Sequence, residues 1–323
     1  MRHGRIRGAL LAGVILTLAL AAPVGAITNG EPDEGEHPYV GQLFFFVPDE
    51  EDDRFDDPGS WFNCTGTLLS PTVVLTAGHC TFGTGLNGVA TTDDGGWGGN
   101  DVWVSFEEEP DYTGIAAAPF IPDDNAGRYV SYRNTLNASD TWIRGTAYPH
   151  PEYDNDAFVF HDAGVVILDD PFVPDVGAGE ATHAVLPRLH YLDTLRGRNK
   201  AQTLFEAVGY GLEFPLSKTD PGGDTRRKSQ QVIVNRNGVY GIHDDSSIVF
   251  SNNNGKPHRG GTCSGDSGGP IFLNNTNLQV AVNSYGVPPN CTGGDGAYRI
   301  DQQDDLDWIR AVLAGDPPRE DAG

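Results

Sequence analysis

The sequence predicts an all-β protein built from antiparallel sheets, and three observations carry that prediction. Short apolar runs rich in Val, Ile, Leu, Phe and Thr recur between clusters of Gly, Pro, Asn and Asp, as is typical of β-strands joined by turns. The 323 residues include 42 Gly and 22 Pro, which interrupt helices too often for a helical array. No long helical pattern separates the apolar runs, which favours antiparallel over parallel pairing.

The strands are expected where the apolar runs fall: 41–47, 66–69, 72–76, 164–168, 231–234 and 279–284, with a further one near 102–106. Two segments interrupt this pattern. The acidic stretch 49–57 is expected to be a solvated loop, because its crowded carboxylates need water. The long segment 82–145 is rich in Gly, Asp and Asn, which indicates a surface insertion.

One clear helix is predicted, at the C-terminal end of the chain. Asp301 is expected to cap it, and Asp304 and Asp305 suit the positive end of its dipole. Gly315 is expected to end it. Its apolar stripe consists of Leu306, Ile309, Val312 and Leu313.

The first residues have the pattern of a secretory signal. A basic start precedes an apolar run over residues 9–22, and small residues follow at Val24 and Ala26. The run is shorter than the roughly 20 residues that a membrane span needs. We therefore expect residues 1–26 to be a signal peptide and the protein to be exported. Cleavage after Ala26 would start the chain at Ile27, and cleavage after Ala22 is the alternative.

Charge excludes two classes of partner. Lys and Arg total 21 against 45 Asp and Glu, for a formal net charge of −24. Nucleic acids and anionic membranes would be repelled by such a surface.

Export also permits disulfides, and four cysteines allow three pairings. Pairing Cys64 with Cys80 and Cys263 with Cys291 would close two short local loops. Each loop would stabilise the fold by about 3 kcal/mol on the chain-entropy estimate.

Three segments carry residues suited to nucleophilic chemistry. In 262–270, glycines flank Ser267, leave its hydroxyl unshielded and let backbone N–H groups turn toward a reacting carbonyl. In 73–80, His79 follows a predicted strand beside Cys80. In 161–168, Asp162 directly precedes an apolar strand. Serine, histidine and aspartate are the parts of acyl transfer through a serine nucleophile.

Chain order separates the hydrolase families that use these parts. The G-x-S-x-G elbow of α/β-hydrolases needs an acid and then a histidine after the serine, whereas the last histidine here, His258, precedes Ser267. The subtilisin order would require a helix-rich α/β context that is missing from this sequence. The order His79, Asp162, Ser267 is that of chymotrypsin.

The motifs themselves resemble those of the chymotrypsin/trypsin-like serine proteases. Residues 76–80 resemble that family's histidine motif, and 265–270 match its serine motif residue for residue. Residues 149–153 are similar to the usual lead-in to the aspartate. Residues 284–286 resemble the strand that lines the substrate cleft, with Tyr285 where Trp is common. The resemblance runs from Ile27 to about Ala314 and is weakest across 82–145.

The resemblance implies two packed six-stranded antiparallel Greek-key β-barrels with a C-terminal α-helix. Residues 27–180 would form the first barrel, which carries the histidine and the aspartate. Residues 181–315 would form the second barrel, with the serine and the terminal helix, and residues 316–323 a tail.

The same resemblance implies a secreted serine endopeptidase with a catalytic triad. Ser267 would attack the peptide carbonyl, His79 would take and return the proton, and Asp162 would orient the imidazole. The backbone N–H groups of Gly265 and Ser267 would form the oxyanion hole. The freed ammonium of Ile27 would pair with Asp266, so signal cleavage alone would give active enzyme. Competitors for these roles are His150, His161 and Asp156.

Primary specificity is expected to be neutral or apolar. Basic-specific members of the family carry an Asp six residues before the serine, where this chain has Gly261. Asp295 leaves a basic preference open. The expected pocket residues are Gly261, Thr262, Ser284, Tyr285, Gly286 and Gly296.

No cofactor and no metal site are expected. Acidic loops could hold Ca²⁺, but EF-hand-like spacing is missing from the sequence. The expected partners are protein or peptide substrates and a proteinaceous inhibitor, and the chain is expected to be a monomer. The alternatives are a protease-like binding protein that has lost turnover and an exported esterase with the same triad.

Overall fold

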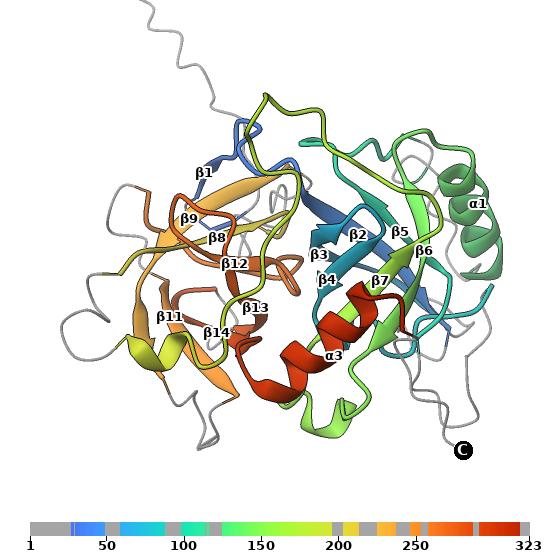
Figure 1. Ribbon diagram of the computed structural model, residues 1–323. Helices are drawn as coiled ribbons and strands as arrows, with labels where there is room; N and C mark the ends of the chain where they lie inside the picture. The colour runs from blue at the N-terminus through green and yellow to red at the C-terminus, as the bar shows by residue number, and fades with distance from the viewer. Residues whose placement is uncertain are drawn as a thin grey trace, which may run out of the picture.

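The computed structural model describes residues 27–28, 30–48, 59–87, 98–113, 115, 125–195, 203–212, 225–236, 246–252, 258–286 and 291–316. The expected signal segment 1–26 and the acidic stretch 49–57 lie outside the described residues. The described chain forms two antiparallel β-structures that lie side by side, with a C-terminal helix packed across the front (Figure 1). The all-β prediction is confirmed.

The first β-structure is a closed six-stranded barrel with strand order β2-β3-β4-β7-β6-β5. Its interior is apolar: Leu43, Leu75 and Val166, for example, are fully buried, and all of β4 is buried. The strands are β2 Val40–Val47, β3 Ser60–Ser70, β4 Val73–Thr76, β5 Val102–Ser105, β6 Ile143–Pro149 and β7 Gly164–Leu168.

The second β-structure is an eight-stranded sheet with order β1-β9-β8-β12-β13-β14-β11-β10. Its strands are β1 Glu31–Pro32, β8 Phe205–Gly209, β9 Arg227–Gln231, β10 Ile233–Asn235, β11 Ser247–Asn252, β12 Pro270–Leu273, β13 Gln279–Gly286 and β14 Gly293–Arg299. Only Val232 separates β9 from β10, and yet β9 pairs with β8 while β10 pairs with β11. This stretch of chain therefore closes the sheet on itself. If β9 and β10 are counted as one bent strand, the sheet consists of the six strands that were predicted and the short strand β1, which pairs with β9.

The insertion 82–145 contains a helix that the sequence analysis did not predict. Helix α1, Asn125–Asn137, packs on the outside of the first barrel (Figure 1). An aromatic cluster lies beneath it, in which Phe44 of β2 stacks on Trp61 of β3 at 4.9 Å between ring centroids. Asn137 accepts a hydrogen bond from Trp103 Nε1 at 3.0 Å. The prediction of a single helix is therefore wrong, because apolar packing against the barrel stabilises α1.

The C-terminal helix α3 spans Gln303–Leu313, but its predicted cap is wrong. Gln302 occupies the N-cap and makes no side-chain cap bond. Asp301 instead accepts hydrogen bonds from Arg299 Nε and from the backbone N–H of Leu192, each at 2.8 Å. A buried guanidinium thus outcompetes the helix end for this carboxylate. Gly315, with a φ of 93°, follows the helix as predicted. Neither helix within the described ranges combines the length and apolarity needed to cross a membrane.

Candidate active site

His79 lies in a short 3-10 turn, Gly78–Cys80, that directly follows β4. Its Nδ1 atom is 3.0 Å from Oδ2 and 3.1 Å from Oδ1 of Asp162, and its backbone N–H donates to Oδ1 at 3.0 Å. Asp162 is fully buried, whereas 24 % of the His79 side chain is exposed. The imidazole ring is therefore held at Nδ1, and the rest of the ring is partly exposed to solvent.

The Asp162 carboxylate also accepts a bond from the second half of the molecule. Ser284 Oγ of β13 donates to Asp162 Oδ2 at 2.5 Å. Burial disfavours the charged form of His79, but the charge and hydrogen bond of Asp162 outweigh it, so the pKa of His79 is raised above its usual 6.5. The pair is thus arranged to stabilise an imidazolium.

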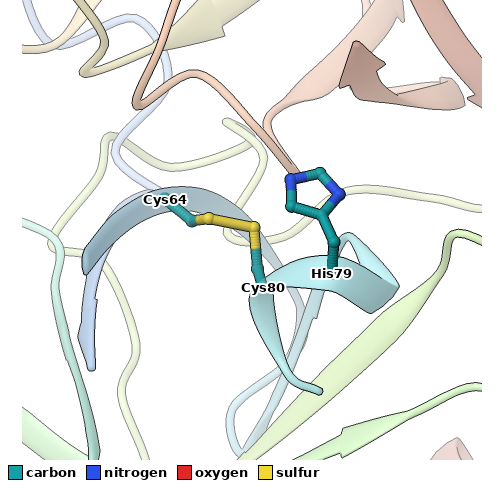
Figure 2. A group of neighbouring side chains, drawn as sticks. All are labelled: Cys64, His79 and Cys80. Atoms are coloured by element: carbon teal, nitrogen blue, oxygen red, sulfur yellow. A yellow bond between two sulfur atoms is a disulfide. The ribbon is translucent and has the colours of Figure 1, made fainter. Parts of the chain in front are cut away.

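A disulfide holds the turn that carries His79. Cys80 is bonded to Cys64 of β3, and the bond lies directly beside the imidazole (Figure 2). The second disulfide joins Cys263 to Cys291. The structure thus pairs the cysteines as two local loops. Cys64, His79 and Cys80 lie close enough to hold a metal, but both sulfurs are used in the disulfide and neither is available as a thiolate.

Ser267 lies in a tight turn between the Cys263 disulfide and β12. Gly265 and Gly268 have φ values of 97° and 76°, a region that favours glycine. The turn is closed by the Asp266 N–H bond to the Cys263 carbonyl at 3.0 Å and by the Gly269 N–H bond to the Asp266 carbonyl at 2.9 Å. The flanking glycines therefore leave Ser267 half-exposed at a sharp bend.

Thr65, which the sequence analysis did not single out, joins this turn to the first barrel. Its backbone N–H donates to the Ser267 carbonyl at 2.8 Å, and its Oγ1 donates to the Gly265 carbonyl at 2.9 Å. Oγ1 also accepts the N–H of Tyr210 at 3.2 Å. The residue is fully buried. No sequence signal marks it except its place next to Cys64, because its partners lie far away in the chain.

Two cavities meet at Ser267. The larger, about 450 Å³, is lined by His79, Gly265 and Ser267 together with the aromatic rings of Phe45, Phe62 and Phe82. The smaller, about 210 Å³, is lined by Thr262, Cys263, Ser264, Ser267, Asn283, Ser284, Tyr285, Gly286 and Cys291. Ser267 therefore faces cavities on both sides.

Four of the six expected pocket residues, Thr262, Ser284, Tyr285 and Gly286, line the smaller cavity. Gly261 and Gly296 do not line it. A Cβ added at Gly261 would lie 1.9 Å from Asn252 Cγ, and one added at Gly296 would lie 2.2 Å from the Tyr285 ring. Gly261 thus gives space to Asn252, and Gly296 gives space to the Tyr285 ring, which itself lines the cavity.

Asp295 lies behind this cavity and is almost fully buried. Its Oδ2 accepts the Thr262 N–H at 2.7 Å and Gln231 Nε2 at 2.5 Å, and its Oδ1 accepts Asn252 Nδ2 at 3.1 Å. Burial raises the pKa of Asp295 to about 7 despite these donors. Both oxygens are thus already engaged by protein groups.

Asp266 is buried in a similar way beneath the serine turn. Its carboxylate accepts the N–H groups of Gly211 at 2.8 Å and Cys263 at 2.9 Å, and burial raises its pKa to about 7. Ile27 is fully buried in the apolar core of the second β-structure. Thr28 pairs with Gly261. The segment that begins at Ile27 therefore already lies within the second half of the molecule.

The competing candidates lie elsewhere. His150 and His161 stack on one another, with ring centroids 5.0 Å apart, and His150 contacts Trp308 of α3 edge-on. Asp156 is exposed in a short 3-10 helix, Asn155–Ala157. It is Asp162 that contacts His79.

Comparison with known proteins identifies what the chain is similar to. Residues 130–309, more than half of the chain, match the family described as trypsin. Serine protease 1 of Drosophila melanogaster is 28 % identical over 292 residues, covering 88 % of this chain and 85 % of that protein. Brachyurin of Leptuca pugilator is 27 % identical over 252 residues, covering 76 % of this chain and 86 % of the relative.

Solved structures share the fold at lower identity. HL collagenase superposes with a TM-score of 0.56 at 18 % identity, covering 89 % of this chain and 99 % of that chain. A scabies mite inactivated protease paralogue, S-D1, gives the same TM-score at 15 % identity, covering 90 % and 98 % of the two chains. At these identities the likeness bears on the fold alone.

Proposed function

Because the chain belongs to the trypsin family, we propose that it is a secreted serine endopeptidase that works through His79, Asp162 and Ser267. The observation that carries the proposal is the contact of His79 Nδ1 with the buried Asp162 carboxylate at 3.0 Å, with Ser267 lining the same cavity as the imidazole. Proteins of this family hydrolyse proteins, so the expected substrates are protein or peptide chains.

In the proposed reaction, Ser267 Oγ attacks the carbonyl carbon of the scissile bond as His79 takes the hydroxyl proton. Asp162 keeps the remaining ring proton on Nδ1 and stabilises the imidazolium that forms. His79 then gives its proton to the leaving amine, which departs and leaves an acyl group on Ser267. Water, activated by the same imidazole, releases the acyl group as a carboxylic acid and restores the serine.

The oxyanion of the tetrahedral intermediate would be held by the backbone N–H groups of Gly265 and Ser267. Donors of this kind contribute about 3–4 kcal/mol each to transition-state stabilisation in a serine protease. Two features support the assignment: the left-handed φ of Gly265, and the bonds from Thr65 that fix the carbonyls of both residues.

Activation would follow from removal of residues 1–26. The new ammonium of Ile27 would pair with the buried Asp266, whose hydrogen-bond donors among the described residues are neutral, the N–H groups of Gly211 and Cys263. A buried carboxylate gains most from a cation when it has none. Secretion itself is supported by the signal-like start of the sequence and by the two disulfides.

Primary specificity would be for neutral or apolar side chains. None of the described residues that line the small cavity is charged, and the oxygens of Asp295 are occupied by Thr262, Gln231 and Asn252. Chromogenic peptides with Phe, Leu, Ala, Arg and Glu before the scissile bond would rank the preference. Highest turnover on the Arg peptide would contradict it.

The second candidate is a binding protein that has lost turnover, because the fold is shared with a protein described as an inactivated protease paralogue. Labelling with a fluorophosphonate separates the two. We expect the wild-type chain that starts at Ile27 to be labelled and to cleave peptide amides, and Ser267→Ala to do neither while keeping its circular dichroism spectrum. A folded wild-type chain that resists the reagent would favour the binding protein. Turnover of esters without amides would favour an esterase.

A further inference from the structure

A second group of chemically reactive side chains lies between the loop before β7 and helix α3. It consists of His150, which follows β6, His161, which precedes Asp162, and Asp305 in the first turn of α3. One ligand atom from each lies within 4.8 Å of the others. No sequence motif points to this cluster, because its members come from three separate segments.

We propose that the His150–His161–Asp305 cluster is a binding site for a divalent transition-metal ion of the Zn²⁺ type. Imidazole nitrogen and carboxylate oxygen are ligands that Zn²⁺ prefers, at bond lengths of about 2.0–2.2 Å. Such bonds put neighbouring ligand atoms roughly 3.4 Å apart in a tetrahedron, so atoms now within 4.8 Å of one another need to close by at most about 1.4 Å on binding. The proposal does not depend on the proposed catalytic function.

The charge around the cluster suits a cation. Asp305 is fully buried, and Tyr298 donates its hydroxyl to both carboxylate oxygens at 3.0 Å. The described residues contain no salt bridge between Asp305 and a basic side chain. Two more carboxylates, Asp304 and Glu152, lie beside His161. A buried carboxylate surrounded by acids is costly unless a cation shares the site.

His161 presents a nitrogen that the protein does not satisfy. Its Nδ1 is buried and makes no hydrogen bond, and the nearest carboxylate oxygen, on Asp304, is 3.6 Å away. Its Nε2 is 3.4 Å from Glu152. Asp304 lies beside Nδ1 and is 49 % exposed, so its side chain is free to move in as a fourth ligand, while Glu152 is placed to accept the Nε2 proton.

His150 is held in place for the same role. Its ring is stacked between His161 and the edge of Trp308, at 5.0 and 4.9 Å between centroids. Its Nδ1 accepts the backbone N–H of Glu152 at 3.2 Å. Coordination through Nε2 moves the single ring proton to Nδ1, at the cost of that long hydrogen bond.

The location gives a bound ion a consequence for the rest of the molecule. His161 is the residue before Asp162, and Asp305 belongs to the terminal helix. A metal bound to both would clamp α3 to the loop that holds His79 in place. We therefore expect the ion to raise the thermal unfolding midpoint by several degrees at saturating concentration.

Isothermal titration of the metal-free chain that starts at Ile27 with Zn²⁺ tests the proposal. We expect one site per chain with a dissociation constant on the order of micromolar. His161→Asn should weaken binding at least about tenfold, as should Asp305→Asn, which keeps an oxygen for the Tyr298 hydroxyl. Asparagine tolerates the left-handed φ of 49° at residue 161. Co²⁺ in place of Zn²⁺ should give the visible absorption of a low-symmetry site in the wild type alone.

Two controls make the outcome decisive. His190→Asn is the matched variant, because His190 has a similar φ of 53° and is exposed, and we expect it to bind Zn²⁺ like the wild type. His79→Gln tests whether the active-site imidazole is the ligand instead, and it too should leave the affinity unchanged. Equal affinity in all variants, or loss confined to His79→Gln, overturns the proposal. Circular dichroism of each variant separates lost binding from lost fold.

Discussion

The two halves of the molecule treat buried carboxylates differently. In the first half, Asp162 accepts hydrogen bonds from the backbone N–H and ring of His79 and from Ser284, so it faces a group that can itself become a cation. In the second half, Asp266 and Asp295 accept bonds from neutral amides, and burial raises the pKa of each to about 7. Asp162 thus contacts a side chain that can carry a positive charge, whereas the hydrogen bonds described for Asp266 and Asp295 come from neutral donors.

Under the proposed activation, processing would act on the second half. The contact of His79 with Asp162 forms within the chain and needs no new charge. The surroundings of Asp266 change if an ammonium is created at Ile27, because that residue already lies in the core of the second half. Thr65 connects the halves, with one bond to the Ser267 carbonyl and another to the Gly265 carbonyl.

The largest expected effect is that of Asp162→Asn in the first half of the molecule. The amide keeps the size of the side chain but stabilises the wrong tautomer of His79, so kcat should fall roughly 10⁴-fold, the effect known for the serine-protease template. In the wild type, His79 must be neutral to act as base, so kcat/KM should rise with pH through a limb above 6.5, because the pKa of His79 is raised. Steady-state rates from pH 5 to 9 test both statements. A variant within tenfold of wild type would show that Asp162 is not the orienting acid.

The next effect concerns the pH dependence of stability that arises from Asp266 in the second half. With a folded pKa of about 7 against 3.8 when unfolded, Asp266 keeps a proton that the unfolded chain releases. Its contribution to stability is therefore full below pH 4 and is lost as pH rises to 7. In a chain that starts at Ile27, the ammonium should lower this pKa and remove most of the loss, which is about 4 kcal/mol at most.

Urea unfolding at pH 4.5 and 7.5 measures this difference, with Ser267→Ala in both chains to prevent self-digestion. The control is a chain that starts at Pro23 and so has no ammonium at Ile27. Every other titrating group is shared by the two chains and cancels in the comparison. Equal pH slopes would contradict the pairing of Ile27 with Asp266.

A smaller effect is expected at the connection between the halves. Thr65→Val keeps the backbone bond to the Ser267 carbonyl but removes the hydroxyl bond to the Gly265 carbonyl. Gly265 should then sample other conformations, so kcat should fall about 10- to 100-fold while KM changes little. Thr65→Ser retains the hydroxyl and should restore most of the rate. A KM effect without a kcat effect would mean that Thr65 shapes the cavity instead of positioning the oxyanion donors.

The smallest effect is expected at Asp295. Because its oxygens are occupied by Thr262, Gln231 and Asn252, Asp295→Asn should change the ratio of kcat/KM for Arg and Phe peptides by less than about threefold. Paired assays on the two peptides give this ratio directly. A tenfold loss of kcat/KM on the Arg peptide alone would show that the Asp295 carboxylate contributes to recognition of a basic side chain.

The features that could be predicted from the sequence are those encoded within short segments of the chain. The glycines around Ser267, the strand before His79 and the cysteine spacing are local, and the structure brings them to one region. Thr65 could not be found in this way, because Gly265 lies 200 residues from it in the chain. The second β-structure was predicted as a barrel. The sequence does not reveal that the strand bends at Val232, so that β9 pairs with β8 and β10 pairs with β11.

Two errors have the same physical origin. Helix α1 has Gly127 and several residues of low helix propensity, and it gains stability from the aromatic cluster on the barrel. The sequence signal that points to this helix is the spacing of Tyr129, Tyr132 and Leu136, which places their side chains on one helical face. Asp301 has the ideal residue type for a cap, but Arg299 takes its carboxylate. Both are cases in which tertiary contacts override local preference.

The aromatic cluster under α1 has an optical consequence. Trp61, Trp103 and Trp142 lie in it, Trp308 lies in α3, and Trp97 lies outside the described residues, whereas the strands of the second β-structure contain no indole. The emission of the four described tryptophans therefore follows the first barrel and the terminal helix, and unfolding confined to the strands of the second half would leave it unchanged. Backbone circular dichroism recorded alongside emission would reveal such a step as a divergence between the two melting curves.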